Sequence, residues 1–174
     1  MGKRRFAVEL AKALSCEQPG RGSLDACDGC PACLQIDAGL HPDVTQLRLP
    51  EDKQEFPITL IQELIQTLGL KPARGGRKIA IVDDADLFND EAANCALKTL
   101  EEPPPLSLLI LLGTSGDQFL PTILSRCQQI RFAPLADAEI KALLEAEGAQ
   151  LTADQWPLLL RAARGRPGGH LPAD

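Results

Sequence analysis

Four cysteines near the start of the chain form the strongest chemical pattern in the sequence. Their spacing is C-x10-C-x2-C-x2-C, and they are Cys16, Cys27, Cys30 and Cys33. The two x2 spacings place neighbouring sulfurs on tight turns, and four thiolates satisfy the tetrahedral preference of Zn²⁺ without an open position. The polar segment that carries them has too few apolar residues for its own core, so metal binding would fold it. We predict a structural zinc site.

Other interpretations of the cysteines remain open. An iron–sulfur cluster is one, although the Cys-Pro that usually follows such a pattern is missing. Free or regulatory cysteines are another. A disulfide framework is weaker, because the sequence begins with an amphipathic pattern and not with a secretion signal. His41 is a further candidate ligand, although a histidine beside Pro42 is more often a loop residue.

Two aspartates, Asp83 and Asp84, directly follow the short apolar run Lys78–Val82. A carboxylate at the carboxyl end of a buried parallel strand lies where α/β sheets bind their ligands. There it could hold a nucleotide-bound Mg²⁺. The alternative is that both aspartates only cap the next segment.

Two more signals are weak when each is taken alone. Gly2 and Lys3 open a helix, as at the end of a phosphate-binding loop G-x-x-x-x-G-K-[ST], but Arg4 stands at the Ser/Thr position and the glycine-rich approach is absent. Arg126 lies in a Ser-Arg-Cys triplet and could reach a neighbour's phosphates across an interface. The alternative is a surface arginine at a helix end.

The elements that must position these residues alternate between helix and strand. We expect a first helix over about 3–15. An apolar stripe from Leu60 to Leu68 predicts a second, which Gly69 would end. A third should begin at a cap, Asn89, and end at the prolines 103–105. The expected strands are Val44–Leu49, Lys78–Val82, Leu106–Leu112 and Gln128–Phe132.

From Pro134 onward the pattern is helical. Asp137 is the expected cap of a helix that buries Ile140, Leu143 and Leu144 and ends at Gly148, and Thr152 with Gln155 has capping-box spacing. We therefore predict an α/β domain over 1–133, with the cysteine insert at 16–42, and the beginning of a helical domain over 134–174.

Composition narrows the class of protein. The chain has 174 residues, of which 44% are hydrophobic and 24% charged, so it can bury a core, and no apolar run reaches membrane-spanning length. The formal net charge of −6, the absence of Tyr and 3% aromatics argue against a nucleic-acid-wrapping surface. Local phosphate contacts remain open at two basic clusters, Arg74/Arg77/Lys78 and Arg161/Arg164/Arg166. We expect a cytoplasmic protein.

Taken together and in this order, the motifs resemble the clamp-loader branch of the AAA+ family, and within it the delta-prime subunits of bacterial DNA polymerase III. The densest stretch runs from Lys78 to Leu106 and includes A-A-N-x-x-L-K-T-L-E-E-P-P, and the Ser-Arg-Cys triplet at 125–127 follows it. The resemblance extends from Gly2 to about Gly169.

The resemblance implies a role for individual residues. Asp83 matches the Walker B aspartate, Asp84 the place of a catalytic glutamate, and Thr114 or Ser115 the sensor of the γ-phosphate. Gly2 and Lys3 match the end of the phosphate loop, and Arg126 matches an arginine finger acting on a neighbour's nucleotide. The remaining matches are the zinc ligands Cys16, Cys27, Cys30 and Cys33, and Arg166 near the second sensor.

The resemblance also implies a fold and a function. The fold is a P-loop-type parallel sheet flanked by helices, with a zinc-module insert and the start of a helical lid; the first strand and phosphate loop would have to precede Met1. The incomplete loop implies an accessory subunit that does not hydrolyse ATP, lends an arginine and helps load the sliding clamp in DNA replication. Implied partners are the gamma/tau and delta subunits, and the sliding clamp and primer-template DNA through the assembled complex.

Two other functions remain as alternatives to the accessory subunit. One is the ATP-hydrolysing gamma/tau motor of the same loader, which a complete G-K-[ST] and an Asp-Glu pair would favour; both are absent from the sequence. The other is a zinc-dependent DNA-binding regulator, which the acidic charge and the lack of a basic, aromatic face disfavour.

Overall fold

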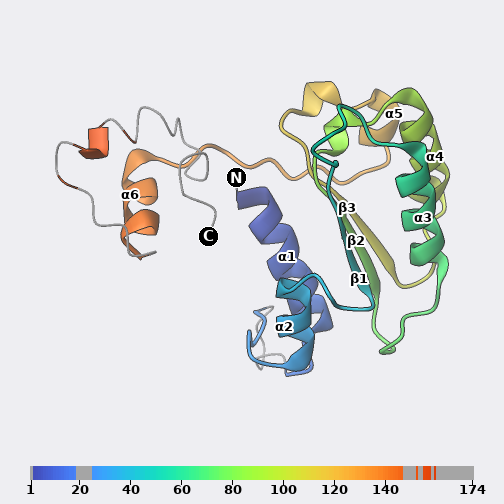
Figure 1. The fold of residues 1–174 in the computed structure, drawn as a ribbon, viewed down its shortest axis with the longest axis horizontal. Helices are drawn as coiled ribbons and strands as arrows, with labels where there is room; N and C mark the ends of the chain where they lie inside the picture. Colours follow the sequence, from blue (N-terminus) through green and yellow to red (C-terminus); the bar gives the residue numbers. More distant parts are fainter. Residues whose placement is uncertain (1, 19–24, 147–151, 153–154, 158, 160–174) are drawn as a thin grey trace. The chain divides into compact units, whose positions relative to one another are not determined.

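The computed structural model describes residues 2–18, 25–146, 152, 155–157 and 159 (Figure 1). The chain divides into two compact units, of which Lys3–Gln129 is the larger, and α6 belongs to the second. Among the described helices, none has the length and apolar character needed to cross a membrane. In chain order the elements are α1 (Gly2–Ser15), α2 (Pro31–Asp37), β1 (Val44–Leu47), α3 (Ile58–Gly69), β2 (Lys78–Val82), a 3-10 turn (Ala85–Leu87), α4 (Asp90–Glu101), β3 (Ser107–Leu111), a 3-10 turn (Gly116–Gln118), α5 (Pro121–Leu124) and α6 (Asp137–Ala146).

The three strands form a parallel sheet in the order β1-β2-β3. Val44 pairs with Ile79, and Lys78 pairs with Ser107. Every residue of β2 is buried, which confirms the expected buried central strand. Parallel neighbours need a crossover, and α3 and α4 supply the two crossovers here. All three strands therefore end at the same edge of the sheet, the carboxyl edge.

Helices cover both faces of this sheet: α1 on one side, α3 and α4 on the other (Figure 1). Successive side chains of β2 point to opposite faces. Ile79 and Ile81 pack in one cluster with Ala7 and Ala11 of α1. On the opposite face, Ala80 and Val82 pack with buried residues of α3 and α4, namely Ile61, Leu64, Leu68, Ala92 and Ala96.

The expected helix signals are confirmed in this unit. The side chain of Asn89 accepts a hydrogen bond of 2.9 Å from the N–H of Ala92, so it caps α4. Asp90 and Glu91 lie in the first turn of α4, where carboxylates stabilise the positive end of the helix dipole. The stripe of α3 buries Ile61, Leu64 and Leu68, and α3 ends at Gly69 as expected.

The strand expected over Gln128–Phe132 is wrong. These residues form no strand, and Ile130 and Phe132 are exposed. An extended segment becomes a strand only when a neighbour pairs with its N–H and C=O groups, and β3, at the edge of the described sheet, pairs only with β2. The apolar pattern alone could not show whether such a neighbour is present.

The second unit has a small core of its own. Ile140 and Leu144 of α6 are buried and pack with Trp156 and Leu159. Asp137 is the first residue of α6 and not its cap; Glu139 instead accepts a 2.7 Å bond from the N–H of Ala136. Half of the expected capping box is present: the N–H of Thr152 donates to Gln155 Oε1 at 2.9 Å, whereas the N–H of Gln155 donates to the backbone carbonyl of Thr152 at 3.0 Å. Gly148 and the side chain of Leu143 lie outside the described residues.

Candidate functional site

The four sulfur atoms predicted as metal ligands lie together. The Sγ atoms of Cys16, Cys27, Cys30 and Cys33 are all within 4.8 Å of one another. Four sulfurs bound to one Zn²⁺ at the usual distance would be separated by about 3.8 Å. All six cysteines are free thiols. The cluster can therefore hold one metal ion, and its four-sulfur donor set suits zinc.

Local backbone geometry brings these sulfurs together. Cys16 directly follows α1, and Cys30 is the N-cap of α2, with Pro31 at the first helical position. Asp28 has φ 53°, in the left-handed region, which reverses the chain between Cys27 and Cys30. The N–H of Cys30 then donates to Cys27 Sγ at 3.3 Å. The seven-residue helix α2 was not expected from the sequence, because so short a helix shows little periodicity.

The two buried sulfurs of the cluster differ in their affinity for a proton. Cys30 Sγ and Cys33 Sγ lie 3.5 Å apart. The backbone N–H groups of Cys33 and Glu17 lower the pKa of Cys30 to about 6. Burial raises the pKa of Cys33 to about 12. Metal binding requires thiolates, so a bound cation would displace the proton that burial favours on Cys33.

A buried lysine of α1 joins that helix to the cysteine segment. Lys12 Nζ lies 3.0 Å from Glu9, 2.6 Å from Asp28 and 3.3 Å from Asp37, and its side chain is 5% exposed. Burial alone would lower the pKa of Lys12, but the three carboxylates together raise it. This role of Lys12 could not be predicted from the sequence, because Asp28 and Asp37 lie 16 and 25 positions away along the chain.

His41 lies outside the metal-compatible cluster. Its Nδ1 accepts a 3.1 Å bond from the N–H of Asp43, and its buried Nε2 has no partner among the described residues. Burial, followed by the charge of Arg74, lowers the pKa of His41. His41 lines a cavity of about 340 Å³ together with Cys16, Glu17 and Arg74. We therefore do not count it among the metal ligands.

The first basic cluster is mostly engaged within the chain. Arg74 binds Glu17 at 2.7 Å and Gln35 at 2.9 Å. Lys78 is buried and binds Asp43 at 3.0 Å, so it offers no charge at the surface. Arg77 is exposed. The second cluster, Arg161, Arg164 and Arg166, lies outside the described residues.

At the carboxyl edge of the sheet, Arg4 of α1 meets Asp83. Arg4 Nη1 lies 3.4 Å from Asp83 Oδ2, and Arg4 Nη2 lies 3.3 Å from Gln46 Oε1. Arg48 Nη2 approaches the same carboxylate oxygen at 3.5 Å. The cavity that these side chains line is only about 30 Å³. The sequence identified Asp83 but could not show that a residue 79 positions away pairs with it.

The other residues matched to a nucleotide site also form contacts within the chain. Lys3 Nζ donates to the carbonyl of Gly113, where a Cβ would clash with the ring of Phe119. Thr114 binds Asp86 through its N–H at 2.7 Å and through its hydroxyl at 2.5 Å. Ser115 accepts a 3.4 Å bond from the N–H of Asp117. The start of α1 and the ends of β2 and β3 thus meet at one edge.

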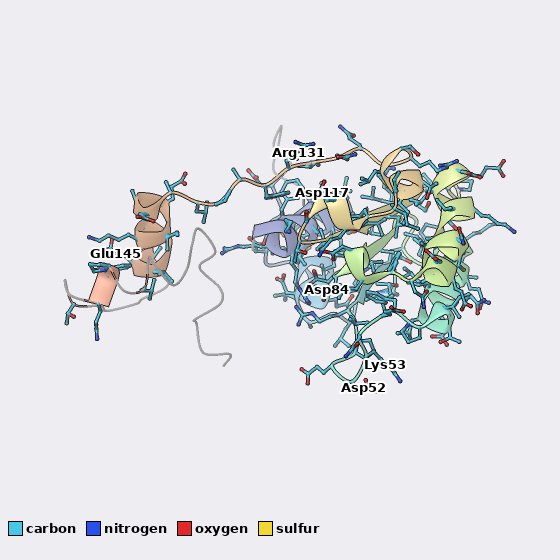
Figure 2. All side chains as sticks on the ribbon, turned by 90° about the horizontal axis from the view of Figure 1, so that it is seen from above. Asp52, Lys53, Asp84, Asp117, Arg131 and Glu145 are labelled. Atoms are coloured by element: carbon cyan, nitrogen blue, oxygen red, sulfur yellow. The ribbon has the colours of Figure 1, made fainter. Side chains whose placement is uncertain are left out.

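Asp84 follows Asp83 in a left-handed conformation, with φ 57° (labelled in Figure 2). Its side chain makes no cap for the turn that begins at Ala85. Burial raises the pKa of Asp84, and the charges of Asp83 and Asp86 add to the rise.

Arg126 lies just after α5 and binds the end of α4. Its Nε and Nη2 lie 2.8 and 2.7 Å from Glu101 Oε1. Its Nη1 donates to the carbonyl of Thr122 at 2.9 Å and to Ser125 Oγ at 3.2 Å. The side chain of Arg126 is 35% exposed, so its remaining N–H can reach solvent.

Comparisons with known proteins show the family to which the chain is similar. Residues 1–136 match the family described as DNA polymerase III, delta subunit. The chain is 35% identical over 147 residues to DNA polymerase III subunit delta' of Pseudomonas aeruginosa, covering 84% of this chain and 44% of that protein. It is 34% identical to the Escherichia coli subunit of the same name, covering 98% and 50%. The chain thus spans about half the length of these relatives.

Related proteins with other names match as well. DNA polymerase III subunit tau of Escherichia coli is 33% identical over 83% of this chain and 22% of its own length. The crystal structure of a DNA polymerase III gamma subunit-related protein from Thermotoga maritima has a TM-score of 0.56 and 26% identity, covering 74% of this chain and 43% of that one. The match to the family model covers well over half of the 174 residues, and the chain belongs to the family of the DNA polymerase III delta subunit.

Proposed function

We propose that this chain is part of a non-hydrolysing subunit of the DNA polymerase III clamp loader, a cytoplasmic complex that helps load the sliding clamp. The names of the relatives support the assembly. The Arg4–Asp83 ion pair at the carboxyl edge of the sheet is the observation that carries the non-hydrolysing role. Residues 134–174 would begin the helical lid of the same subunit.

The ion pair matters because of what a nucleotide-bound Mg²⁺ requires. Mg²⁺ takes oxygen ligands in near-octahedral geometry, commonly a carboxylate, a hydroxyl and water. Arg4 stands where the hydroxyl would be, and a guanidinium offers only donors. Its positive charge already neutralises Asp83, and Lys3, the residue that would hold a phosphate, donates to Gly113. The edge is therefore satisfied without nucleotide.

The cysteine cluster supports a structural zinc ion. Cys16, Cys27, Cys30 and Cys33 would hold it, and four protein ligands leave no position for a substrate. The metal would supply folding energy to the insert and no chemistry to a reaction. Lys12 would fix the loop between Cys27 and Cys30 through Asp28.

Arg126 would act on nucleotide held by a neighbouring gamma/tau-type subunit. A guanidinium supplied across an interface neutralises charge that develops on the transferred phosphoryl group. Its position on an exposed turn after α5 supports this role. The delta subunit would be a further partner, and the sliding clamp and primer-template DNA would be reached through the complex.

Nucleotide binding tests the non-hydrolysing role directly. Isothermal titration of the full-length protein with Mg-ATP should give no stoichiometric binding, because Arg4 and Lys3 already occupy the site. A gamma/tau-type motor subunit, titrated in the same buffer, is the positive control. Stoichiometric binding with micromolar affinity would contradict the conclusion that Arg4 and Lys3 close this site to nucleotide.

A further inference from the structure

We propose that Glu101 is a positioning residue for Arg126: it competes with phosphate for the guanidinium and so restrains the arginine until a neighbour's nucleotide displaces it. The inference rests on the proposed role of Arg126 in a neighbouring site. It assigns a function to a glutamate that ends α4 and takes no part in the carboxyl edge of the sheet.

Two elements, α4 and α5, supply the partners of this arginine. Glu101 comes from the last residue of α4, and Arg126 follows the four-residue helix α5. A single oxygen, Glu101 Oε1, lies 2.8 Å from Nε and 2.7 Å from Nη2. On the other side of the guanidinium, Thr122 O and Ser125 Oγ accept from Nη1. The two sides are thus held by different kinds of acceptor, one charged and one neutral.

Counting donors shows what must change when phosphate binds. A guanidinium has five N–H groups. In this arrangement Nε–H, one N–H of Nη2 and both of Nη1 point to acceptors of the chain, which leaves one N–H free. A two-pronged phosphate contact needs two N–H groups on one edge. The Nε/Nη2 edge can therefore receive phosphate only if Glu101 releases it.

The geometry allows the Nε/Nη2 edge to be released while Nη1 stays bound. Thr122 and Ser125 lie within the same turn as Arg126, so they can keep Nη1 in place while the opposite edge exchanges partners. The exchange replaces a single negative charge with a more highly charged phosphate. Arg126 and Glu101 have side chains that are 35% and 49% exposed, and such exposed pairs shift populations only about two- to fivefold. The restraint is thus weak enough for nucleotide to overcome.

The neighbouring residue provides a matched control. Glu102 is also exposed, and no hydrogen bond or ion pair of its side chain occurs among the described residues. Glu101→Gln and Glu102→Gln change the net charge equally, within one position of each other. Only the first removes the carboxylate from Arg126.

The experiment measures ATP hydrolysis of the full-length protein reassembled with its partner subunits. The Arg126-dependent part of turnover is the ATP hydrolysis rate of each protein minus the rate of the same protein with Arg126→Ala added. We expect Glu101→Gln to raise this part about two- to fivefold, because the guanidinium is free more often. Glu102→Gln should leave it unchanged. Glu101→Asp, whose oxygen is drawn back by one methylene, should give a smaller rise.

The outcomes separate this inference from the function on which it rests. An unchanged or lowered Arg126-dependent turnover in Glu101→Gln overturns the inference, as does a rise that persists in the Arg126→Ala background. If Arg126→Ala alone leaves turnover unchanged, the arginine has no role in the neighbouring site, and both fail. Matching thermal melts of Glu101→Gln and Glu102→Gln show that folding does not produce the difference.

Discussion

Asp43 is the residue on which the loop before β2 depends. It is 2% exposed and accepts hydrogen bonds from the N–H groups of Ala73 and Arg74, at 2.7 and 2.9 Å. Lys78 Nζ lies 3.0 Å from the same carboxylate. The Asp43 carboxylate is thus bound by two N–H groups and one ammonium group, which compensate for its burial. Without it, Lys78 would be a buried charge with one carbonyl, that of Pro42, as its partner.

We expect Asp43→Asn to lower the free energy of unfolding by about 3 kcal/mol at pH 7, because it removes one partner of a buried ion pair. Burial by itself raises the pKa of Asp43, but the N–H groups and Lys78 lower it below its usual 3.8. A lowered folded-state pKa means that the carboxylate stabilises the fold fully above pH 4 and loses this effect as the pH falls through the folded value. Urea unfolding at pH 7 and pH 3 should therefore show a smaller difference between the proteins in acid. A difference that is constant or grows in acid would contradict this account.

At the scale of single residues, a role could be predicted where the residues lie close together in the sequence, but not where the partners lie far apart in it. The four cysteines could be assigned from the sequence because three of them lie within seven positions and their chemistry is specific. Arg4 with Asp83, and Glu101 with Arg126, could not be paired. Their side chains meet only because the sheet and its helices bring distant segments together.

Among the elements, the cysteine insert is not separate from the sheet. Ile36 of α2 is fully buried in the cluster that contains Val44 and Ile79. Gln46 Nε2 of β1 donates to the carbonyl of Ile36 at 2.9 Å. The metal-compatible cluster is therefore not the sole anchor of the insert, because this contact with β1 and the Lys12 ion pairs also hold it. Loss of the metal should release the cluster and leave the contact with β1.

We expect the purified protein to carry one zinc ion per chain, and Cys30→Ser to lose it. The substitution removes a ligand whose binding energy stabilises the insert, so residues 25–35 should lose structure while β2 stays protected. Metal analysis by mass spectrometry and hydrogen exchange of the two regions measure this. Iron in place of zinc, or less than about half an equivalent of zinc in the unmodified protein, would contradict the zinc assignment. Cys95→Ser, outside the cluster, is the control.

Elements with strong periodicity or clear caps could be predicted from the sequence. Helices α1, α3 and α4 and the buried strand β2 follow such signals. Helix α2 could not, because its seven residues follow from a turn that a metal would stabilise. The strand expected over Gln128–Phe132 failed for the opposite reason: its apolar pattern is adequate, but strand formation depends on a partner that local sequence does not specify.

At the scale of the whole molecule, the larger unit contains both the carboxyl edge of the sheet and the turn that carries Arg126. Three parallel strands bring the start of α1 and the ends of β2 and β3 to one edge, where the charges are paired within the chain. The arginine of the Ser-Arg-Cys triplet lies after α5, beyond the last strand. A subunit that does not use its own site can therefore still present Arg126.

We expect Arg126→Ala, in the full-length protein, to allow assembly with partner subunits and to impair ATP hydrolysis at the adjacent site. Such arginines contribute about 10³–10⁵ in rate, but in a ring with several sites the loss in total turnover should be partial. Arg126→Lys should rescue little, because an ammonium lacks the planar pair of donors. Clamp-stimulated hydrolysis and a thermal melt measure the two effects. Normal turnover with a lowered melting temperature would show that Arg126 only stabilises the fold, through its ion pair with Glu101.

The all-parallel sheet also influences the order in which the parts of the chain can fold. No two neighbouring strands can pair until the helical crossover between them has folded back, so sheet formation needs contacts between distant parts of the chain. The four cysteines, by contrast, all lie within the first 33 residues. During synthesis the cysteine segment can close around a metal as soon as Cys33 has emerged, whereas β2 cannot acquire both neighbours before Leu111 has emerged. Zinc availability would then act on the cysteine segment before these three strands have assembled.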